Sequence, residues 1–124
     1  MKILSTKWFN KWIKKSGLSN NDLIDAIENL ENGLATANLG SHLFKVRVKK
    51  EHSGKSSGFR TIVVYQKNNK AIFLYGFGKN DKSNIDNSEL QYFKKFGNDL
   101  MAMNQKQIEQ FIAKEILFNI EVRK

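Results

Sequence analysis

The residues of this chain that could do chemistry are mostly lysines and arginines in its central third. Residues 42–82 hold ten of these cations against two acidic residues, Glu51 and Asp81. Cations grouped in this way bind a polyanion through its phosphates, and arginine also stabilises the charge that develops when a phosphodiester is broken. Three uses remain open at this point: solubility, binding of a polyanion, and chemistry on a polyanion.

One reaction suits a group of cations that has no paired carboxylates. The 2′-hydroxyl of RNA can attack its neighbouring phosphate when a site supplies a general base, a general acid and cations that stabilise the transition state. A lysine crowded by like charges has a lowered pKa and can act as the base. His52 is the other candidate, because the unperturbed pKa of histidine lies near neutrality. The segment GKSSG at residues 54–58 lacks the spacing of a nucleotide-binding P-loop. Cleavage of RNA without a metal ion is therefore the chemistry that fits the sequence.

Alternating apolar and basic residues predict a strand at residues 44–49, FKVRVK. Because neighbouring residues of a strand point to opposite faces, its apolar residues should be buried and its cations exposed. The exposed cations would be Lys45, Arg47 and Lys49. Alternate residues of a strand are roughly 6.5–7 Å apart, close to the separation of phosphates in an extended nucleic acid. This strand therefore predicts a surface for a phosphate backbone.

Two further strands are predicted at residues 59–65 and 71–77, joined by a tight turn. Both are apolar on each face, which indicates central strands of an antiparallel sheet. Arg60 begins the first of them, on the face that also carries Ile62 and Val64. An arginine in this place would be held rigidly by its strand.

The polar loops at residues 50–58 and 78–85 should lie at the end of the sheet where Arg60 begins its strand, because antiparallel strands return there. The loops add four residues that could contact a nucleic acid: His52, Lys55, Lys79 and Lys82. Cations from separate parts of the chain are thus expected to converge: Lys45, Arg47, Lys49, Lys55, Arg60, Lys79 and Lys82.

Helical spacing of apolar residues predicts two helices before these strands. The first ends at Gly17, and the second begins at Ser19, which has the spacing of a capping box with Asp22. The two helices are expected to form an antiparallel hairpin. The aromatic stripe of the first helix, with Trp8 and Trp12, is expected in the core; an exposed stacking platform is the alternative.

Two more helices are predicted after the strands. One begins near Asp86 or Asn87, and the other begins at Asn104 with a second capping box. The alternating residues 118–122 indicate an edge strand. The sequence thus predicts one α+β domain over residues 1–124, with an N-terminal helical hairpin, an antiparallel β-meander and C-terminal helices.

The net charge of +9 is distributed unevenly along the chain. Residues 1–16 hold five lysines and no acid, whereas residues 17–41 hold four acids and no base, which favours one basic face. There is no cysteine, and the two histidines lack the spacing of metal ligands, so neither a metal nor another cofactor is expected. No apolar run approaches a membrane span, and the first residues lack a secretory signal, so a cytoplasmic location is expected.

The stretches FKVRV, SGFRTIVVY and AIFLYGFGKND, followed by KSNI and preceded by the helical pair, resemble the RelE/ParE superfamily of bacterial type II toxins. Within it, the chain is most similar to RelE-like or HigB-like toxins with a long C-terminal helical part. The resemblance covers nearly the whole chain. It implies a microbial RNase-like core, translation arrest by cutting mRNA on the ribosome, and neutralisation by a cognate antitoxin encoded nearby, which could be acidic or a helix-turn-helix protein.

The resemblance also implies roles for single residues. Lys45 and Arg47 match two basic residues of the family's active strand. Arg60, within SGFR, matches its phosphate-stabilising arginine, and Lys79 matches a lysine that follows the last strand. These four are the implied catalytic residues. The other polar residues expected at this end of the sheet would contact the RNA: Lys49, Lys55, Lys82 and His52.

The sequence departs from the family pattern at three positions, of which one is among these four. Arg47 stands where the family has a lysine that acts as general base, and arginine stays protonated. Asn80 replaces an arginine, and Asp86 stands where a tyrosine is expected. The base would then be one of Lys45, Lys49 or His52. Two alternatives to RNA cleavage also remain: a ParE-like inhibitor of DNA gyrase, and a basic domain that binds nucleic acid without cutting it.

Overall fold

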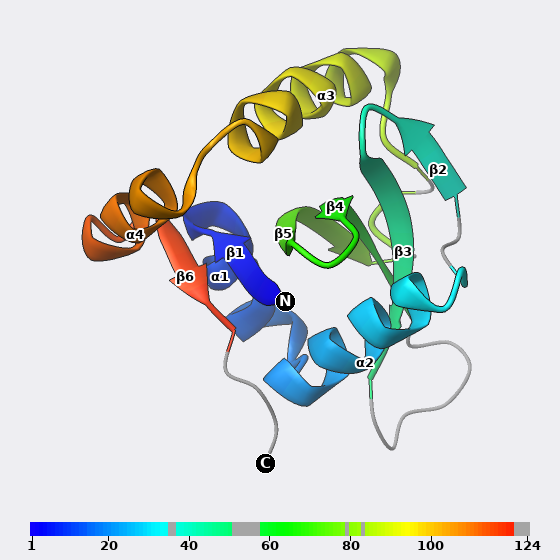
Figure 1. Ribbon diagram of the computed structural model, residues 1–124. Coiled ribbons are helices and arrows are strands. Elements are labelled where there is room, and N and C mark those ends of the chain that lie inside the picture. Colours follow the sequence, from blue (N-terminus) through cyan, green and yellow to red (C-terminus); the bar gives the residue numbers. More distant parts are fainter. Residues whose placement is uncertain (35–36, 51–57, 79, 83, 121–124) are drawn as a thin grey trace.

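The structure is a computed structural model that describes residues 1–34, 37–50, 58–78, 80–82 and 84–120 (Figure 1). Within these residues, strands and helices follow one another in the order β1 (Lys2–Thr6), α1 (Lys7–Ser16), α2 (Asn20–Glu31), β2 (Ala37–Gly40), β3 (Leu43–Lys49), β4 (Gly58–Gln66), β5 (Lys70–Gly78), α3 (Asn87–Met101), α4 (Gln105–Ala113) and β6 (Leu117–Asn119). The α+β class predicted from the sequence is confirmed.

In the described part of the chain the strands form one six-stranded sheet in the order β2-β3-β4-β5-β1-β6. The predicted antiparallel meander is its centre, since β4 pairs antiparallel with both β3 and β5. The sheet is nevertheless twice as wide as the three-stranded meander that the sequence predicts, because β1, β2 and β6 extend it. Strand β1 also pairs in parallel with β5, and the pairing begins with Lys2 opposite Lys70. The predicted edge strand near the C-terminus is β6.

The ends of the helices follow the local signals in the sequence. Gly17 ends α1 in the left-handed conformation, with φ of 77°, which glycine adopts without strain. Ser19 and Asp22 form the predicted capping box of α2, and Asn104 opens α4 with the second one. Asp86 caps α3, where the third helix was expected to begin. These caps satisfy backbone N–H groups that would otherwise lack partners.

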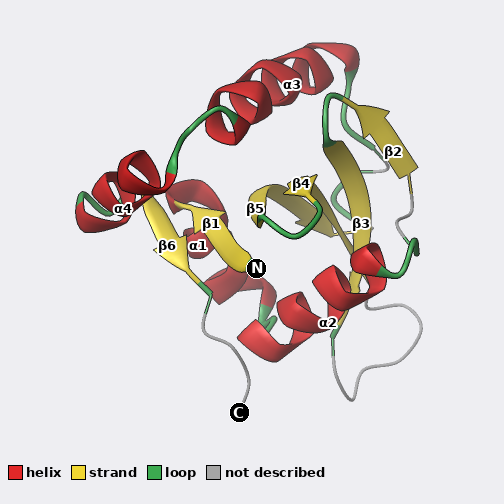
Figure 2. Ribbon diagram, viewed as in Figure 1, coloured by secondary structure: helices red, strands yellow, loops and turns green. Residues whose placement is uncertain are grey.

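The two faces of the sheet are covered by different helices (Figures 1 and 2). One face packs against α1 and α2 in a hydrophobic cluster that includes Phe9, Leu23 and Phe73. The other packs against α3 and α4 in a cluster that includes Ile62 and Phe93. The mutual antiparallel orientation predicted for the first two helices stays a prediction. In the residues that the structure describes, no helix combines the length and the hydrophobicity needed to span a bilayer.

Candidate nucleic-acid interface

The pairing of β3 with β4 aligns the predicted strand cations with Arg60. Arg47 lies directly opposite Arg60, with Lys45 opposite Ile62 and Lys49 opposite Gly58. Residues directly opposite each other in an antiparallel pair point to the same face, and Ile62 belongs to the cluster under α3 and α4. The cations therefore share that face, at the end of the sheet beyond its apolar cluster. We call Lys45, Arg47, Lys49 and Arg60 the cation row.

The centre of the cation row is a pair of arginines, Arg47 and Arg60, in direct cross-strand register. Like charges directly opposite each other destabilise a sheet. In addition, Nη1 of Arg60 is buried and has no hydrogen-bond partner among the described residues, and such a group costs about 1–3 kcal/mol. A phosphate between the two guanidinium groups would remove both penalties, because each can donate a pair of parallel hydrogen bonds to its oxygens.

Gly58 lets the side chain of Arg47 lie against β4. A Cβ atom built on Gly58 would lie 3.2 Å from both Nε and Nη2 of Arg47, which is closer than ordinary van der Waals contact. A residue with a Cβ at this position would therefore require the flexible guanidinium group to move by a small amount. The glycine thus leaves room for Arg47 against β4.

The segment after β5 returns to the cation row, as expected for the second polar loop. Nζ of Lys45 donates a hydrogen bond of 3.4 Å to Oδ1 of Asn84. The same oxygen accepts the backbone N–H of Ile85 at 2.9 Å. The ammonium group of Lys45 is therefore near the entry to α3, half-buried and close to the other cations of the row.

Lys82 lies next to the row but is already paired with an acid. Its Nζ is 2.7 and 2.8 Å from the two carboxylate oxygens of Glu89, and it lies 5.5 and 5.9 Å from the ring centroids of Tyr75 and Phe77. This hydrogen bond is the main reason that the pKa of Lys82 is raised and the pKa of Glu89 is lowered. Phe77 is opposite Arg60, so Lys82 extends the row towards β5 with its charge partly neutralised.

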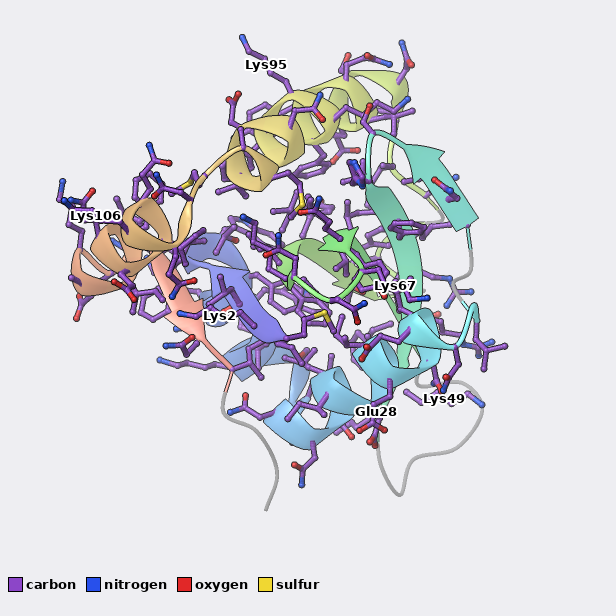
Figure 3. The ribbon with its side chains drawn as sticks, in the orientation of Figure 1. Lys2, Glu28, Lys49, Lys67, Lys95 and Lys106 are labelled. Carbon is purple, nitrogen blue, oxygen red and sulfur yellow. The ribbon has the colours of Figure 1, made fainter. Side chains whose placement is uncertain are left out.

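A groove on the other side of β3 carries charges of both signs. Among the described residues, β2 pairs with β3 at residues 43–45 and not along the rest of β3. The groove there has a volume of about 550 Å³ and is lined by Asp22, Asp25, Ala26, Asn29, Leu34, Arg47 and Lys49. Figure 3 labels Lys49 on β3 and Glu28 on α2. Arg47 and Lys49 thus belong to the cation row by their register and also border acidic residues of α2 at this edge of the sheet.

Three of the predicted site residues, His52, Lys55 and Lys79, lie outside the described residues. Their convergence with the row stays a prediction. Conversely, Tyr75 and Glu89 are not among the residues predicted for this site. The spacing of Asp86 and Glu89 is that of a capping box and could have indicated Glu89, although not its partner.

The fold and the cation row define a basic α+β protein. The family model described as RelE toxin of RelE / RelB toxin-antitoxin system matches residues 1–120. The chain therefore belongs to the RelE toxin family, whose members pair with an antitoxin, and the resemblance seen in the sequence is confirmed. A search of curated proteins finds no match to the chain.

Proposed function

We propose that this toxin is an endoribonuclease that cuts mRNA on the ribosome without a metal ion. The family gives the toxin role. The observation that carries the reaction is the Arg47–Arg60 pair, with one buried guanidinium nitrogen that has no partner in the described part of the chain. Two such groups are matched to a phosphate that gains charge in the transition state.

In the proposed reaction the 2′-hydroxyl oxygen attacks the adjacent phosphorus. A general base accepts the hydroxyl proton, a P–O bond forms to the 2′ oxygen, and the bond to the 5′ oxygen breaks as that oxygen takes up a proton. The products carry a cyclic phosphate and a 5′-hydroxyl. Arg60 and Arg47 stabilise the charged phosphorane through paired hydrogen bonds. Lys45, Lys49 and His52 are the candidates for the base, and Lys79 is the remaining candidate for charge stabilisation.

The same row accounts for binding of the RNA backbone. Lys49 would extend the phosphate contacts along β3, and Lys55, His52 and Lys82 would add contacts from the loops. Binding of this kind is independent of base sequence and weakens as salt rises. The cognate antitoxin would silence the toxin by covering the row with an acidic segment, and the site of action would be the cytoplasm, where ribosomes translate.

Arg60→Ala and Arg60→Lys test this function, with Lys95→Ala as a matched control. Lys95 points away from the sheet on α3 (Figure 3), so its loss changes the net charge and leaves the row intact. Lysine keeps the charge of Arg60 but cannot bind two phosphate oxygens at once. Both Arg60 variants should lose about 100- to 1,000-fold in cleavage, and Arg60→Lys should keep most of its affinity for RNA.

The measurements are growth after induction, primer extension on a reporter mRNA and a thermal melt of each purified variant. Full toxicity of Arg60→Ala would place the site elsewhere. Loss of toxicity together with loss of the folded state would give Arg60 a structural role. Toxicity without cut mRNA, accompanied by gyrase inhibition, would favour the ParE-like alternative; binding of RNA without toxicity would favour a non-catalytic basic domain.

A further inference from the structure

Helix α1 exposes a tryptophan beside the row. Trp8 keeps 48% of its surface exposed, whereas Phe9 on the same helix is fully buried. The expectation that this aromatic stripe lies in the core therefore holds for Phe9 and is wrong for Trp8. The Trp8 ring centroid is 4.6 Å from that of Tyr75 on β5 and 6.4 Å from that of Trp12. An exposed indole ring that packs on other aromatic rings offers a flat face on which planar ligands stack.

Trp8 forms one wall of an open groove with a volume of about 400 Å³. The other walls come from β5, α3 and the segment before β6, and the lining is mostly aromatic: Tyr75, Tyr92, Phe93 and Phe96. Tyr92 is 64% exposed, and its ring centroid is 6.0 Å from that of Phe96. Large apolar side chains that remain exposed together, rimmed by polar groups, mark a binding site.

Lysines lie in and near this groove. Lys7 is part of its lining, and the ammonium of Lys82 is 5.5 Å from the centre of the Tyr75 ring. Trp8 also borders a second hollow of about 180 Å³, whose lining includes Lys11 and Lys15. Neither hollow has an acidic residue in its described lining. Aromatic faces between cations are the combination that binds single-stranded nucleic acids, through stacked bases and paired phosphates.

The groove lies on the strand next to the one that carries Arg60. Tyr75 pairs with Ile62, and Phe77 pairs with Arg60 on the neighbouring strand. Adjacent strands are about 4.8 Å apart, so the groove begins one strand away from Arg60. An RNA with a phosphate between Arg47 and Arg60 could therefore lay the base of a nearby nucleotide on Trp8.

We propose that the groove formed by Trp8, Tyr75 and Tyr92 is a stacking site for an unpaired nucleobase of the RNA held by the cation row. This inference rests on the proposed function, because the row must hold an RNA. A nucleobase fits the site better than an apolar protein segment does, since Lys7 in the lining complements the phosphates next to the base. An apolar segment would bring no anionic partner for this ammonium group.

The test compares two probes of equal length: a single-stranded oligoadenylate and an abasic sugar–phosphate oligomer. The two carry the same charge, so only a site for bases distinguishes them. The wild type should bind the oligoadenylate more tightly, with quenching of tryptophan fluorescence. Trp8→Ala should weaken this binding by about five- to a hundredfold and leave the abasic oligomer unaffected. Trp8→Phe should restore most of the difference, and thermal melts should match the wild type.

Several outcomes would overturn the inference. One is an equal loss of affinity for both probes in Trp8→Ala; another is no loss for either. Loss of the antitoxin complex with unchanged oligoadenylate binding would assign the groove to a protein segment instead.

Failure of the stacking site is distinguishable from failure of the proposed function. If Trp8→Ala binds and cleaves normally while Arg60→Ala is inactive, only the stacking site is wrong. If binding depends on Trp8 and on the bases while Arg60→Ala cleaves as well as the wild type, the stacking site is right and the proposed cleavage site is wrong.

Discussion

Each end of the β4–β5 hairpin holds a cation with a buried nitrogen, and the two differ in whether that nitrogen is hydrogen-bonded. At the turn, Lys70 is only 5% exposed, and its Nζ donates a 2.8 Å hydrogen bond to the carbonyl of Met103. At the open end, Nη1 of Arg60 is buried and lacks a partner within the described residues, and the strand beside it presents Arg47. One cation is satisfied by the fold, and the other is left for something outside it.

This difference indicates what each end is for. Native proteins pair nearly all buried polar groups, so each exception requires a reason. Lys70 links the central hairpin to the connection between α3 and α4, which is a structural task. Arg60 contributes a penalty to the free protein that a bound anion would remove. We therefore expect the end with the unsatisfied cation to be the end that binds a ligand.

Methionine substitutions at the two positions test the comparison most strongly, because they should change stability in opposite directions. Lys70→Met leaves the Met103 carbonyl without its donor and should lower the free energy of unfolding by about 1–2 kcal/mol. Arg60→Met removes a like-charge pair and an unsatisfied nitrogen, and should raise the free energy of unfolding by up to about 1 kcal/mol. Urea denaturation of both variants measures the two changes. Destabilisation of similar size at both sites would mean that Arg60 is as structural as Lys70.

The pH dependence of Lys70 gives the same experiment a second readout. Burial lowers the pKa of Lys70 from its ordinary value of 10.5. Between the lowered pKa and 10.5, the unfolded chain binds this proton and the folded chain does not, so the free energy of unfolding should rise with pH in that window. Lys70→Met should lack this rise, whereas Arg60→Met should retain it.

Gly58→Ala should have a smaller effect, confined to the open end of the hairpin. The new methyl group would displace the guanidinium of Arg47, a flexible side chain, so stability should change by less than about 1 kcal/mol. Cleavage should fall by about tenfold, because a misplaced catalytic group loses orientation. The measurements are single-turnover cleavage and a thermal melt. Unchanged cleavage would show that the position of Arg47 against β4 is irrelevant to the reaction.

Glu89→Gln should have the smallest effect, and it should strengthen binding. Glutamine can still accept the Asp86 N–H in the capping box, but it no longer neutralises Lys82. RNA affinity should rise a few-fold, with a logarithmic salt slope steeper by about 0.7, the value for one added contact to a single strand. Titrations at several salt concentrations measure both, and an unchanged slope would exclude Lys82 from the interface.

The same substitution should change the acid side of the stability profile. Lys82 holds the pKa of Glu89 below its ordinary value of 4.5. The ion pair therefore contributes stability above pH 4.5, which is lost as the pH falls through the lower pKa of the folded state. Thermal melts of Glu89→Gln should show a weaker dependence on pH in that window.

Much of the fold follows from local sequence signals. The alternation in residues 44–49 identified both the strand and its exposed cations, and capping residues such as Ser19 and Asn104 located helix starts. β1 has no such signal, because it is five residues long and its partner β5 lies some 70 residues further along the chain. β2, with the sequence ANLG, lacks the β-branched residues that favour strands.

The candidate site, like the fold, could be predicted from the sequence only in part. The shared face of Arg47 and Arg60 could be predicted, because strand periodicity fixes which side chains lie together. The Lys82–Glu89 pair depends on the path of the segment between β5 and α3, which periodicity does not specify. The exposure of Trp8 depends on how α1 is rotated. Phe9, Trp12 and Ile13 pack against the sheet, which places Trp8 at the flank of the buried face.

The position of β1 has a consequence for the synthesis of the protein. β1 is the first strand of the described chain to be made, yet it lies between β5 and β6, the last strand of the described chain. At about 5–20 residues per second, roughly 6–23 s separate synthesis of its first residue from that of Asn119. Helix α1, which carries Trp8, follows β1 directly, and the groove also includes Ile116. The groove can therefore be completed only after residue 116 has been made, whereas the hairpin of β3 and β4 can form much earlier.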